Sequence, residues 1–400
     1  MNFPPVMTEG SSRAFKFASS MPDLGWQPVV IALNNVVEQG VEQFPFDVHY
    51  VGHEVARENL DAEQLFRFVH GLPQKKVLSK NIRTNIRLNT GVKGSNWKKK
   101  AEAVASQVLH DNPDVEMIYA QAPPFAPQQL AIELSGKHHL PVIFDCIGDF
   151  DDDKMEAMIL FSGHCVVMPS REKKEFFLRK YRGRLSHDEV SIVKNGYDPA
   201  FLPTQSQQGE EGLLMRWVFQ LEKLRERELK EFFSGLSNFV AAQPAIRGAV
   251  TLAFTGNGSE GVGRYLKKNG LEELVDTDAV CSHRQELDLC MQADLYCMVL
   301  GTEEGHEMHI PERFYDVVGM RTSLAGIVPD GLARQILLEA GGMVAPISSG
   351  NEISEFLQES YNLWRSGQLP VTSEEKADGY HIRSSLQEFL REMAFRLPPV

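Results

Sequence analysis

Four short apolar runs decide the fold class in the first half of this sequence: Val115-Glu-Met-Ile-Tyr119, Leu140-Pro-Val-Ile-Phe-Asp145, His164-Cys-Val-Val-Met168 and Val190-Ser-Ile-Val193. Each run has the length and the apolar composition of a β-strand. Helix-length amphipathic segments separate them, at 128–139 and 171–181. Strands that alternate with helices at this spacing indicate right-handed crossovers and a largely parallel sheet.

The same alternation extends in both directions along the chain. Upstream it adds a strand at 28–33 and a helix at 97–110, and downstream it stops near Asn195-Gly196-Tyr197-Asp198 and the polar segment 204–212. It then restarts as a second α/β unit, with strands predicted at 213–219, 249–255, 293–300, 323–328 and 342–346. We therefore predict two α/β domains, 1–203 and 204–372, followed by a terminal segment, 373–400, that contains a helix over 380–396. Open α/β sheets bind ligands beyond the carboxyl ends of their strands, so the groove between two such domains is the expected site.

The composition excludes several classes of protein. The chain has 400 residues, of which 42% are hydrophobic and 24% charged, which is ordinary for globular domains and excludes disordered and collagen-like chains. Its net charge of −13 argues against nucleic acid as a partner, because affinity for phosphate backbones comes from clustered Lys and Arg. Residues 64–101 nevertheless contain many Lys and Arg and no Asp or Glu. This stretch is either a solvated face or a surface for anionic lipid, and we expect peripheral membrane contact through 67–100.

The cysteines indicate a cytoplasmic protein. The sequence has 5 of them, Cys146, Cys165, Cys281, Cys290 and Cys297, without a C-x-x-C pair, and we expect reduced thiols in the core. No apolar run reaches the roughly 18 residues that span a bilayer, and the N-terminus does not resemble a signal peptide. We therefore expect location in the cytoplasm, with any membrane contact at its inner face.

Two small-residue turns could face an anion. The turn Gly10-Ser11-Ser12-Arg13 precedes a helix, whose amide groups and positive end attract anions, although an ordinary N-cap is the simpler interpretation. Gly256, Gly258 and Gly261 match the spacing of a dinucleotide fingerprint after a strand. Because that strand does not begin a mononucleotide fold, we favour a tight turn.

Two polar clusters could suggest a metal. Asp149 and Asp151–Asp153 could hold a divalent cation, but such a cluster is also typical of a helix N-terminus, which we prefer here. His306 and His309 lack the four-residue spacing of an H-E-x-x-H zinc site. We predict no metal site and no cofactor.

Several segments, taken in order along nearly the whole chain, resemble the retaining glycosyltransferases of family 4, which have the GT-B fold of two Rossmann-like domains facing a cleft. The segments are Ser11-Ser12-Arg13, Leu24-Gly25-Trp26-Gln-Pro28, Pro113-Asp114 to Phe125, Ile192-Val-Lys-Asn195-Gly196-Tyr197-Asp198, Phe254-Thr-Gly256-Asn-Gly258, Ala279–Leu287, Ile310–Asp316 and Val328-Pro329-Asp330-Gly331. The terminal helix over 380–396 resembles the one that returns to the first domain.

The resemblance implies a metal-independent hexosyltransferase that uses a nucleoside-diphosphate sugar and a glycan or lipid-linked acceptor, in the synthesis of surface polysaccharide or glycoconjugates. Asp145 and Asp149 are the implied acceptor-side catalytic groups. The implied donor-binding residues are Gly10, Ser12, Arg13, Lys223, Arg225, Ser282, His283, Arg313 and Asp316. Asp316 would bind the ribose, and the cations would neutralise the departing diphosphate.

Departures from the family pattern support a second hypothesis. Met308 stands where the family has its first Glu, Phe219 or Gln220 where a strand ends in Gly, Arg321 where a Gly is usual, and Ile147 where the loop after Asp145 carries Arg. A catalytically eroded protein of the same fold, acting as a partner subunit or glycan-binding module, is therefore the alternative. An epimerase or phosphorylase is a third class, for which the sequence offers no convincing residues. The family's first strand also has no counterpart except Met1-Asn2-Phe3, so we expect either a start further upstream or another segment in its place.

Overall fold

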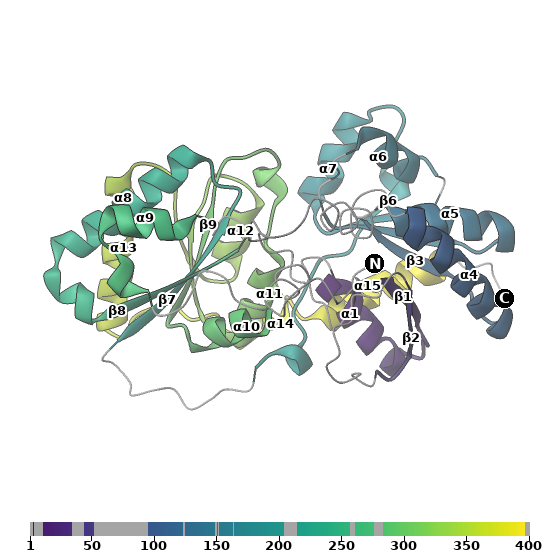
Figure 1. Cartoon of the computed structure of the whole chain (residues 1–400), viewed down its shortest axis with the longest axis horizontal. Coiled ribbons are helices and arrows are strands. Elements are labelled where there is room, and N and C mark those ends of the chain that lie inside the picture. The colour runs from purple at the N-terminus through teal and green to yellow at the C-terminus, as the bar shows by residue number, and fades with distance from the viewer. Residues whose placement is uncertain are drawn as a thin grey trace, which may run out of the picture. The chain divides into compact units, whose positions relative to one another are not determined.

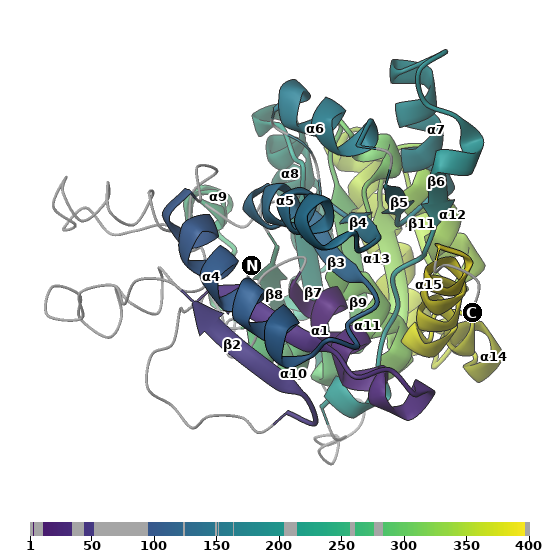
Figure 2. The same cartoon turned by 90° about the vertical axis from the view of Figure 1, so that its right-hand side faces the viewer.

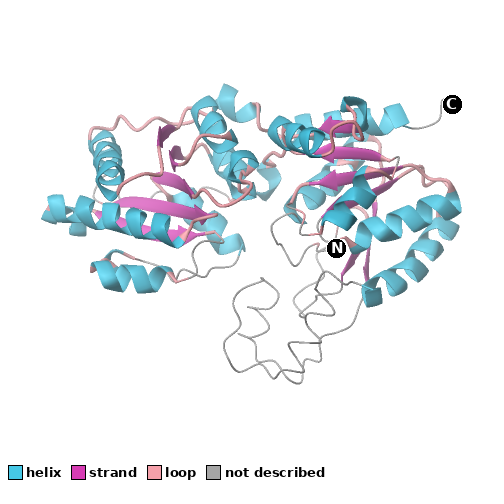
Figure 3. Ribbon diagram, turned by 90° about the horizontal axis from the view of Figure 1, so that it is seen from above, coloured by secondary structure: helices cyan, strands magenta, loops and turns pink. Residues whose placement is uncertain are grey.

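The structure is a computed structural model of the whole chain. It describes residues 3, 11–33, 44–51, 95–122, 125–148, 150, 152–162, 164–203, 214–256, 261–275 and 283–396. The chain divides into two compact units, unit 1 (Met1–Asn195 with Ile382–Val400) and unit 2 (Gly196–His381). The sequence had predicted divisions at 203/204 and 372/373. In both units, helices cover the sheets on either side (Figure 3).

Unit 2 contains a five-stranded parallel sheet with the strand order β11-β10-β9-β7-β8. The strands are β7 (Met215–Glu222), β8 (Val250–Thr255), β9 (Leu295–Leu300), β10 (Ser323–Ile327) and β11 (Met343–Ala345). All five predicted strands are confirmed, and β7 extends beyond the predicted end at Phe219 to Glu222. The register places Phe219 between Phe254 of β8 and Cys297 of β9.

Two layers of helices enclose this sheet (Figure 1). One face is covered by α8 (Glu226–Ala242), α9 (Val262–Asn269) and α13 (Gly350–Arg365), and the other by α10 (His283–Gln292), α11 (Glu312–Met320) and α12 (Leu332–Glu339). On α13, Ile353, Leu357 and Tyr361 are buried at helical spacing, and Ser349 caps the N-terminus by accepting from Glu352 N at 3.4 Å. Each fully buried large apolar side chain contributes about 1.5–3 kcal/mol, so these two apolar layers hold the sheet in place. A short helix, α14 (Glu374–Asp378), follows α13.

Unit 1 contains a four-stranded parallel sheet with the order β3-β4-β5-β6. Its strands are β3 (Ile118–Ala122), β4 (Val142–Cys146), β5 (Cys165–Met168) and β6 (Val190–Ile192). A separate two-stranded parallel sheet pairs β1 (Val29–Leu33) with β2 (Asp47–Val51), and the sequence had not predicted β2. Each predicted strand of this half is present, although β3 begins three residues after the predicted Val115.

Helices lie on both faces of unit 1. The helices α4 (Ser95–Asp111), α5 (Ala126–His138), α6 (Asp153–Leu160) and α7 (Arg171–Lys180) lie on one face (Figure 2). The helices α1 (Ser11–Ser20) and α15 (Ile382–Arg396) lie on the other, where the rings of Phe17 and Phe389 are 5.1 Å apart. The terminal helix α15 thus belongs to unit 1, as the resemblance implies. Short 3-10 helices span Pro22–Leu24, His187–Glu189, Pro199–Phe201, Pro244–Gly248, Glu272–Leu274 and His306–Met308.

The strands of unit 1 form two sheets where the alternating pattern predicts one. Within the described ranges, β1 pairs with β2 alone and β3 with β4 alone. A single apolar cluster beneath α4 and α5 nevertheless joins Leu33 and Val51 of the small sheet to Ile118 of the larger one. Among the described residues, unit 1 therefore lacks the central strand that the family pattern places first.

The structure also tests the predictions about cysteine and membrane spans. Cys146, Cys165, Cys290 and Cys297 are buried, as predicted, and Cys281 lies outside the described residues. None of the helices among the described residues combines the length and hydropathy of a membrane-spanning segment.

Candidate functional site

The strand order of unit 2 creates a topological switch point between β7 and β9. The chain leaves β7 toward β8 at one side and leaves β9 toward β10 at the other, so the loops after these two strands diverge. Open α/β sheets bind their ligands in the crevice that such a divergence creates at the carboxyl ends of the strands. The candidate site of unit 2 is therefore the pair of loops that follow Glu222 and Leu300.

Two predicted donor-binding cations lie at this switch point. Lys223 and Arg225 are both in the loop after β7, and each donates to a carbonyl of the loop after β9. Lys223 Nζ lies 3.3 Å from Glu304 O, and Arg225 Nη2 lies 2.6 Å from Thr302 O. The structure thus places both cations where the fold predicts a ligand, and it directs them at backbone carbonyls of the facing loop.

A carboxylate from α8 lies between the same two loops. Glu228 Oε2 accepts from the Arg225 N–H at 2.8 Å, and Glu228 Oε1 accepts from the Thr302 N–H at 3.1 Å and from the Thr302 hydroxyl. Gly301 makes this contact possible, because a Cβ there would lie 2.5 Å from Glu228 Oε2 and 2.6 Å from Leu224 Cα. Sequence reasoning missed Glu228, Gly301 and Thr302. The available signals were a Gly directly after an apolar strand, and the three-residue spacing of Arg225 and Glu228 at a helix start.

Arg313 and Asp316, two further predicted donor-binding residues, form a buried ion pair on α11. Arg313 Nη1 lies 3.0 Å from Asp316 Oδ2, and Nη2 lies 2.8 Å from Glu286 Oε2 on α10. Burial lowers the pKa of Arg313, but the carboxylates of Glu286 and Asp316 outweigh it, so the pKa lies above its ordinary value. Arg313 and Asp316 are 6% and 3% exposed, so their charged groups serve the packing of α10 against α11. Glu286 was not singled out in the sequence.

In unit 1 the structure brings Arg13 and Asp145 together. Arg13 Nε lies 2.7 Å from Asp145 Oδ2, and its other nitrogens donate to Val193 O at 2.8 Å and Lys194 O at 2.6 Å. The Tyr119 hydroxyl also donates to Asp145 Oδ2 at 2.7 Å. Burial, and then the charge of Asp145, raise the pKa of Tyr119 well above its ordinary range. This network joins α1 to β3 and to the carboxyl ends of β4 and β6, and it uses two residues predicted to meet substrate.

One carboxylate oxygen of Asp145 makes no hydrogen bond with the described part of the chain. Oδ1 is buried and has no hydrogen-bond partner in the described part of the chain, and the same is true of Nε2 of Gln121. Gln121 lies directly opposite Asp145 in the parallel register, so the two side chains leave the sheet on the same face. An acceptor and a donor thus lie side by side near the carboxyl edge, a pairing that suits a hydroxyl group.

Lys173 holds the loop that follows β4. Its side chain is 3% exposed, and Nζ donates to Ile147 O at 2.9 Å and to Gly148 O at 2.5 Å. These two residues directly precede Asp149, which lies outside the described residues. A buried ammonium group costs free energy unless carbonyl or carboxylate oxygens surround it, so this contact fixes the loop strongly.

Several other predicted site residues cannot be placed. Gly10 and Ser282 lie outside the described residues, and His283 begins α10 with no described side chain. Ser12 is buried in the first turn of α1.

The acidic cluster before α6 could have suggested a metal site. Asp152 caps α6 by accepting from Lys154 N and Met155 N at 2.9 and 3.1 Å, which confirms the helix N-terminus. Among the residues that the structure describes, no three His, Cys, Asp or Glu side chains gather in a way that could hold a metal ion.

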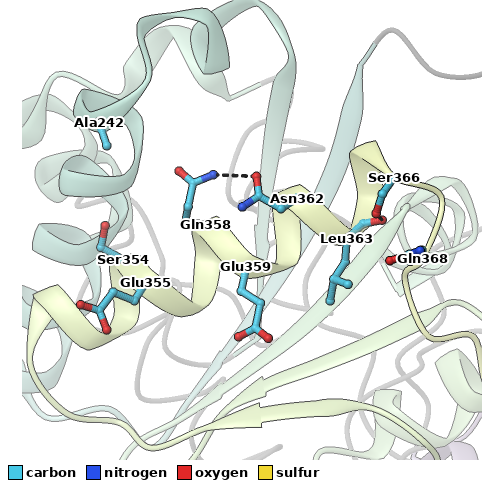
Figure 4. A pocket seen from close by; sticks show the side chains of 9 residues that line it. All are labelled: Ala242, Ser354, Glu355, Gln358, Glu359, Asn362, Leu363, Ser366 and Gln368. Atoms are coloured by element: carbon cyan, nitrogen blue, oxygen red, sulfur yellow. Dashed lines mark hydrogen bonds between the residues drawn. The ribbon is translucent and has the colours of Figure 1, made fainter.

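A surface hollow of about 740 Å³ lies along α13, lined by polar residues together with Ala242 and Leu363 (Figure 4). Gln358 Nε2 donates to Asn362 Oδ1 at 3.1 Å within it. The remaining lining residues are Ala242, Ser354, Glu355, Glu359, Leu363, Ser366 and Gln368. No predicted site residue lines this hollow.

Comparison with known proteins identifies the fold. No protein-family model and no curated protein sequence matches the chain. Solved structures do match: a sucrose-phosphate synthase from Thermosynechococcus elongatus has a TM-score of 0.64 and 12% identity, with 98% of this chain and 95% of that chain covered. A glycosyltransferase from Rickettsia africae has a TM-score of 0.59 and 11% identity over the same shares of both chains. Anabaena HepE, in complex with UDP and glucose, has a TM-score of 0.53 and 11% identity over 74% of this chain and 81% of its own. The chain therefore has the GT-B fold.

Proposed function

We propose that this protein is a glycosyltransferase that moves a hexosyl unit from a nucleoside-diphosphate sugar to a glycan or lipid-linked acceptor. The observation that carries the proposal is the match of almost the whole chain to a sucrose-phosphate synthase and to a glycosyltransferase. Anabaena HepE, which matches about three quarters of the chain, was solved with UDP-glucose. A UDP-sugar is therefore the first donor to test. Retention of the anomeric configuration and independence of metal are further parts of the proposal, and both rest on the sequence resemblance.

The proposed donor site is the switch point of unit 2. A departing diphosphate needs cations and N–H groups aimed at its oxygens. Lys223 and Arg225 lie there on the loop that begins α8, and the amide groups at the start of a 17-residue helix add positive potential. Arg313 and Asp316 are paired with each other, so a direct role in binding the donor would require this pair to separate. Lys223 and Arg225 are therefore the better-supported donor cations.

The proposed acceptor site is the carboxyl edge of β3 and β4 in unit 1. Asp145 Oδ1 and Gln121 Nε2 would offer an acceptor and a donor to one hydroxyl group of the acceptor molecule. Both atoms are buried in the structure, so this contact requires the residues that cover them to move. Asp149, which follows Gly148 in the sequence and lies outside the described residues, stays a predicted second acidic group of the acceptor site. Gly10, Ser12, Ser282 and His283 stay predicted contacts of the donor, whereas Arg13 would have to leave its buried pair with Asp145 to reach it. Residues 52–94 lie outside the described part of the chain, so membrane contact through 67–100 stays a prediction, as does a cytoplasmic location.

Calorimetry with UDP-, GDP-, ADP- and dTDP-sugars tests the donor site. We expect one of these sugars to bind, and Arg225→Ala to weaken binding about tenfold or more, since a charge-assisted hydrogen bond is worth about 1.5–3 kcal/mol. Arg247→Ala is the matched control. Arg247 precedes β8, so it lies at the amino ends of the strands, away from the loops after β7 and β9, and it pairs with Glu273. Failure of all four sugars to bind would contradict the proposal.

A second candidate function is a catalytically eroded binding protein of the same fold. Three contacts favour it: the pairs Arg13–Asp145 and Arg313–Asp316, and the Glu228 carboxylate at the switch point. In the two ion pairs, side chains that were predicted to bind substrate bind other protein groups. At the switch point, the Glu228 carboxylate binds the N–H groups that a substrate would need. Measured donor hydrolysis or transfer would exclude this candidate, whereas glycan binding without donor binding would favour it.

A further inference from the structure

The loops after β7 and β9 are joined across the switch point by backbone and side-chain hydrogen bonds. Gly301 N donates to Glu222 O at 2.9 Å, and Glu303 N donates to Lys223 O at 3.3 Å. The side chains of Lys223 and Arg225, on the loop after β7, also donate to Glu304 O and Thr302 O on the loop after β9. The crevice that the topology predicts is therefore closed by the chain's own groups.

The group at the centre of this closure is an anion. Glu228 receives N–H groups from both sides, from Arg225 at the start of α8 and from Thr302 after β9, together with the Thr302 hydroxyl. Backbone N–H groups that converge from two loops at a helix N-terminus are the arrangement with which proteins bind phosphate oxygens. The carboxylate of Glu228 thus occupies the donors that a phosphate group would use.

We infer that Glu228 is a resident anion that competes with the diphosphate of the donor for the N–H groups of Arg225 and Thr302, and so sets the affinity of the site. This inference rests on the proposed function and specifies how its donor enters. A diphosphate and the Glu228 carboxylate repel each other and need the same hydrogen-bond donors, so the carboxylate must leave before the diphosphate can bind. Its departure also removes the bonds that the N–H and the hydroxyl of Thr302 donate, while Arg225 still bonds Thr302 O. Donor binding is therefore coupled to a change in the hydrogen bonds that hold the loop after β9.

Isosteric replacement of Glu228 separates this competition from simple helix capping. In Glu228→Gln the charge is lost, and one oxygen becomes an NH2 group, so the side chain can no longer accept from the N–H groups of both Arg225 and Thr302. We expect the affinity for UDP, measured by calorimetry, to rise about tenfold or more in Glu228→Gln and in Glu228→Ala. The matched control is Glu226→Gln, which removes the same charge from the same helical turn, where Glu226 pairs with Lys230 and not with Thr302. Thermal unfolding of each variant, measured beside binding, shows that it is folded.

Each outcome decides the inference. Tighter UDP binding in both Glu228 variants, with Glu226→Gln unchanged, supports it, and so does binding in the Glu228 variants when the original protein binds none. Binding that is unchanged or weaker in folded Glu228 variants, while the original protein binds UDP, overturns the inference and leaves the donor proposal intact. An equal gain in Glu226→Gln overturns it as well, because the effect would then be general charge. Failure of the original protein and all variants to bind any of the four nucleotide sugars overturns both proposals.

Discussion

Arg13 and Asp145 are 132 residues apart in the sequence, and they form a fully buried ion pair in unit 1, with 2.7 Å between Nε and Oδ2. The guanidinium group also lies 4.8 Å from the centre of the Phe17 ring and donates to two carbonyls at the end of β6. One side chain therefore connects the first helix to two strands of the sheet. Both residues were predicted to meet substrate, and the structure gives them a role in holding unit 1 together.

Arg13→Met is expected to lower the free energy of unfolding by about 3–5 kcal/mol, because it leaves the carboxylate of Asp145 buried without its ionic partner. The control is Lys98→Met, which removes the surface pair of Lys98 and Glu133 and should cost less than about 1 kcal/mol. Urea unfolding followed by circular dichroism measures both. Similar small losses in the two variants would show that the buried pair has no special role.

The buried phenol group of Tyr119 should make the folded protein lose stability at alkaline pH. Its pKa in the folded protein is raised above the ordinary 10.0, first by burial and then by Asp145, so the folded state holds the phenol proton more tightly than the unfolded state. Stability from this group is complete below about pH 10 and is lost as the pH rises from there toward the folded pKa. In Tyr119→Phe the fall in unfolding free energy between about pH 9 and about pH 11 should be smaller. An unchanged fall would contradict this assignment.

The ring of Tyr197 packs against Gly319 on α11. The main-chain N–H of Tyr197 donates to Tyr380 O at 3.0 Å. A Cβ at Gly319 would lie 2.8 Å from Tyr197 Cε2 and closer still to two other ring atoms. Gly319→Ala should therefore destabilise unit 2 by about 1–3 kcal/mol, although Ala is the better helix former. Gly263→Ala on α9 is the control, because a Cβ there meets nothing within 4 Å, and it should stabilise by about 0.5–1 kcal/mol. Thermal and urea unfolding distinguish the two signs.

Lys173→Met should release the loop that precedes Asp149. Loss of the bonds to Ile147 O and Gly148 O leaves two partly buried carbonyls without this partner and should cost about 1–3 kcal/mol. If the protein transfers sugar, kcat should fall while KM for the donor stays unchanged, because Lys173 and the donor cations lie in different units. Lys174→Met, which removes a surface bond to His187 O, is the control. A matching fall in Lys174→Met would argue against a positioning role for Lys173.

Pattern and local chemistry were sufficient for most elements. Apolar runs such as Cys165–Met168 and Leu295–Leu300 are buried over their whole length, so composition alone marks them as strands. The cap at Asp152 was predictable because a side chain and the amides it accepts from are close in sequence. The strand β2 was missed because only two of its five residues, Val48 and Val51, are aliphatic, and its burial comes from α4 and from pairing with β1.

The candidate site was only partly predictable. Lys223 and Arg225 were found because a diphosphate requires cations after the first strand of unit 2. Glu228, Thr302 and Glu286 were not, since each acquires its importance from a partner about 27 to 77 residues away. No periodicity or spacing along the chain reports such a contact.

The sequence by itself determined two α/β units, their parallel strands, the burial of the described cysteines and the set of polar residues near the strand ends, because these depend on periodicity and on neighbours in the chain. Only the tertiary structure decided which of those polar residues meet one another. It paired Arg13 with Asp145 and Arg313 with Asp316, and it placed Glu228 between the N–H groups of Arg225 and Thr302. The physical reason is that a charge removed from water must find an opposite charge or a hydrogen-bond donor within about 3 Å, and the folded chain alone determines which groups come that close.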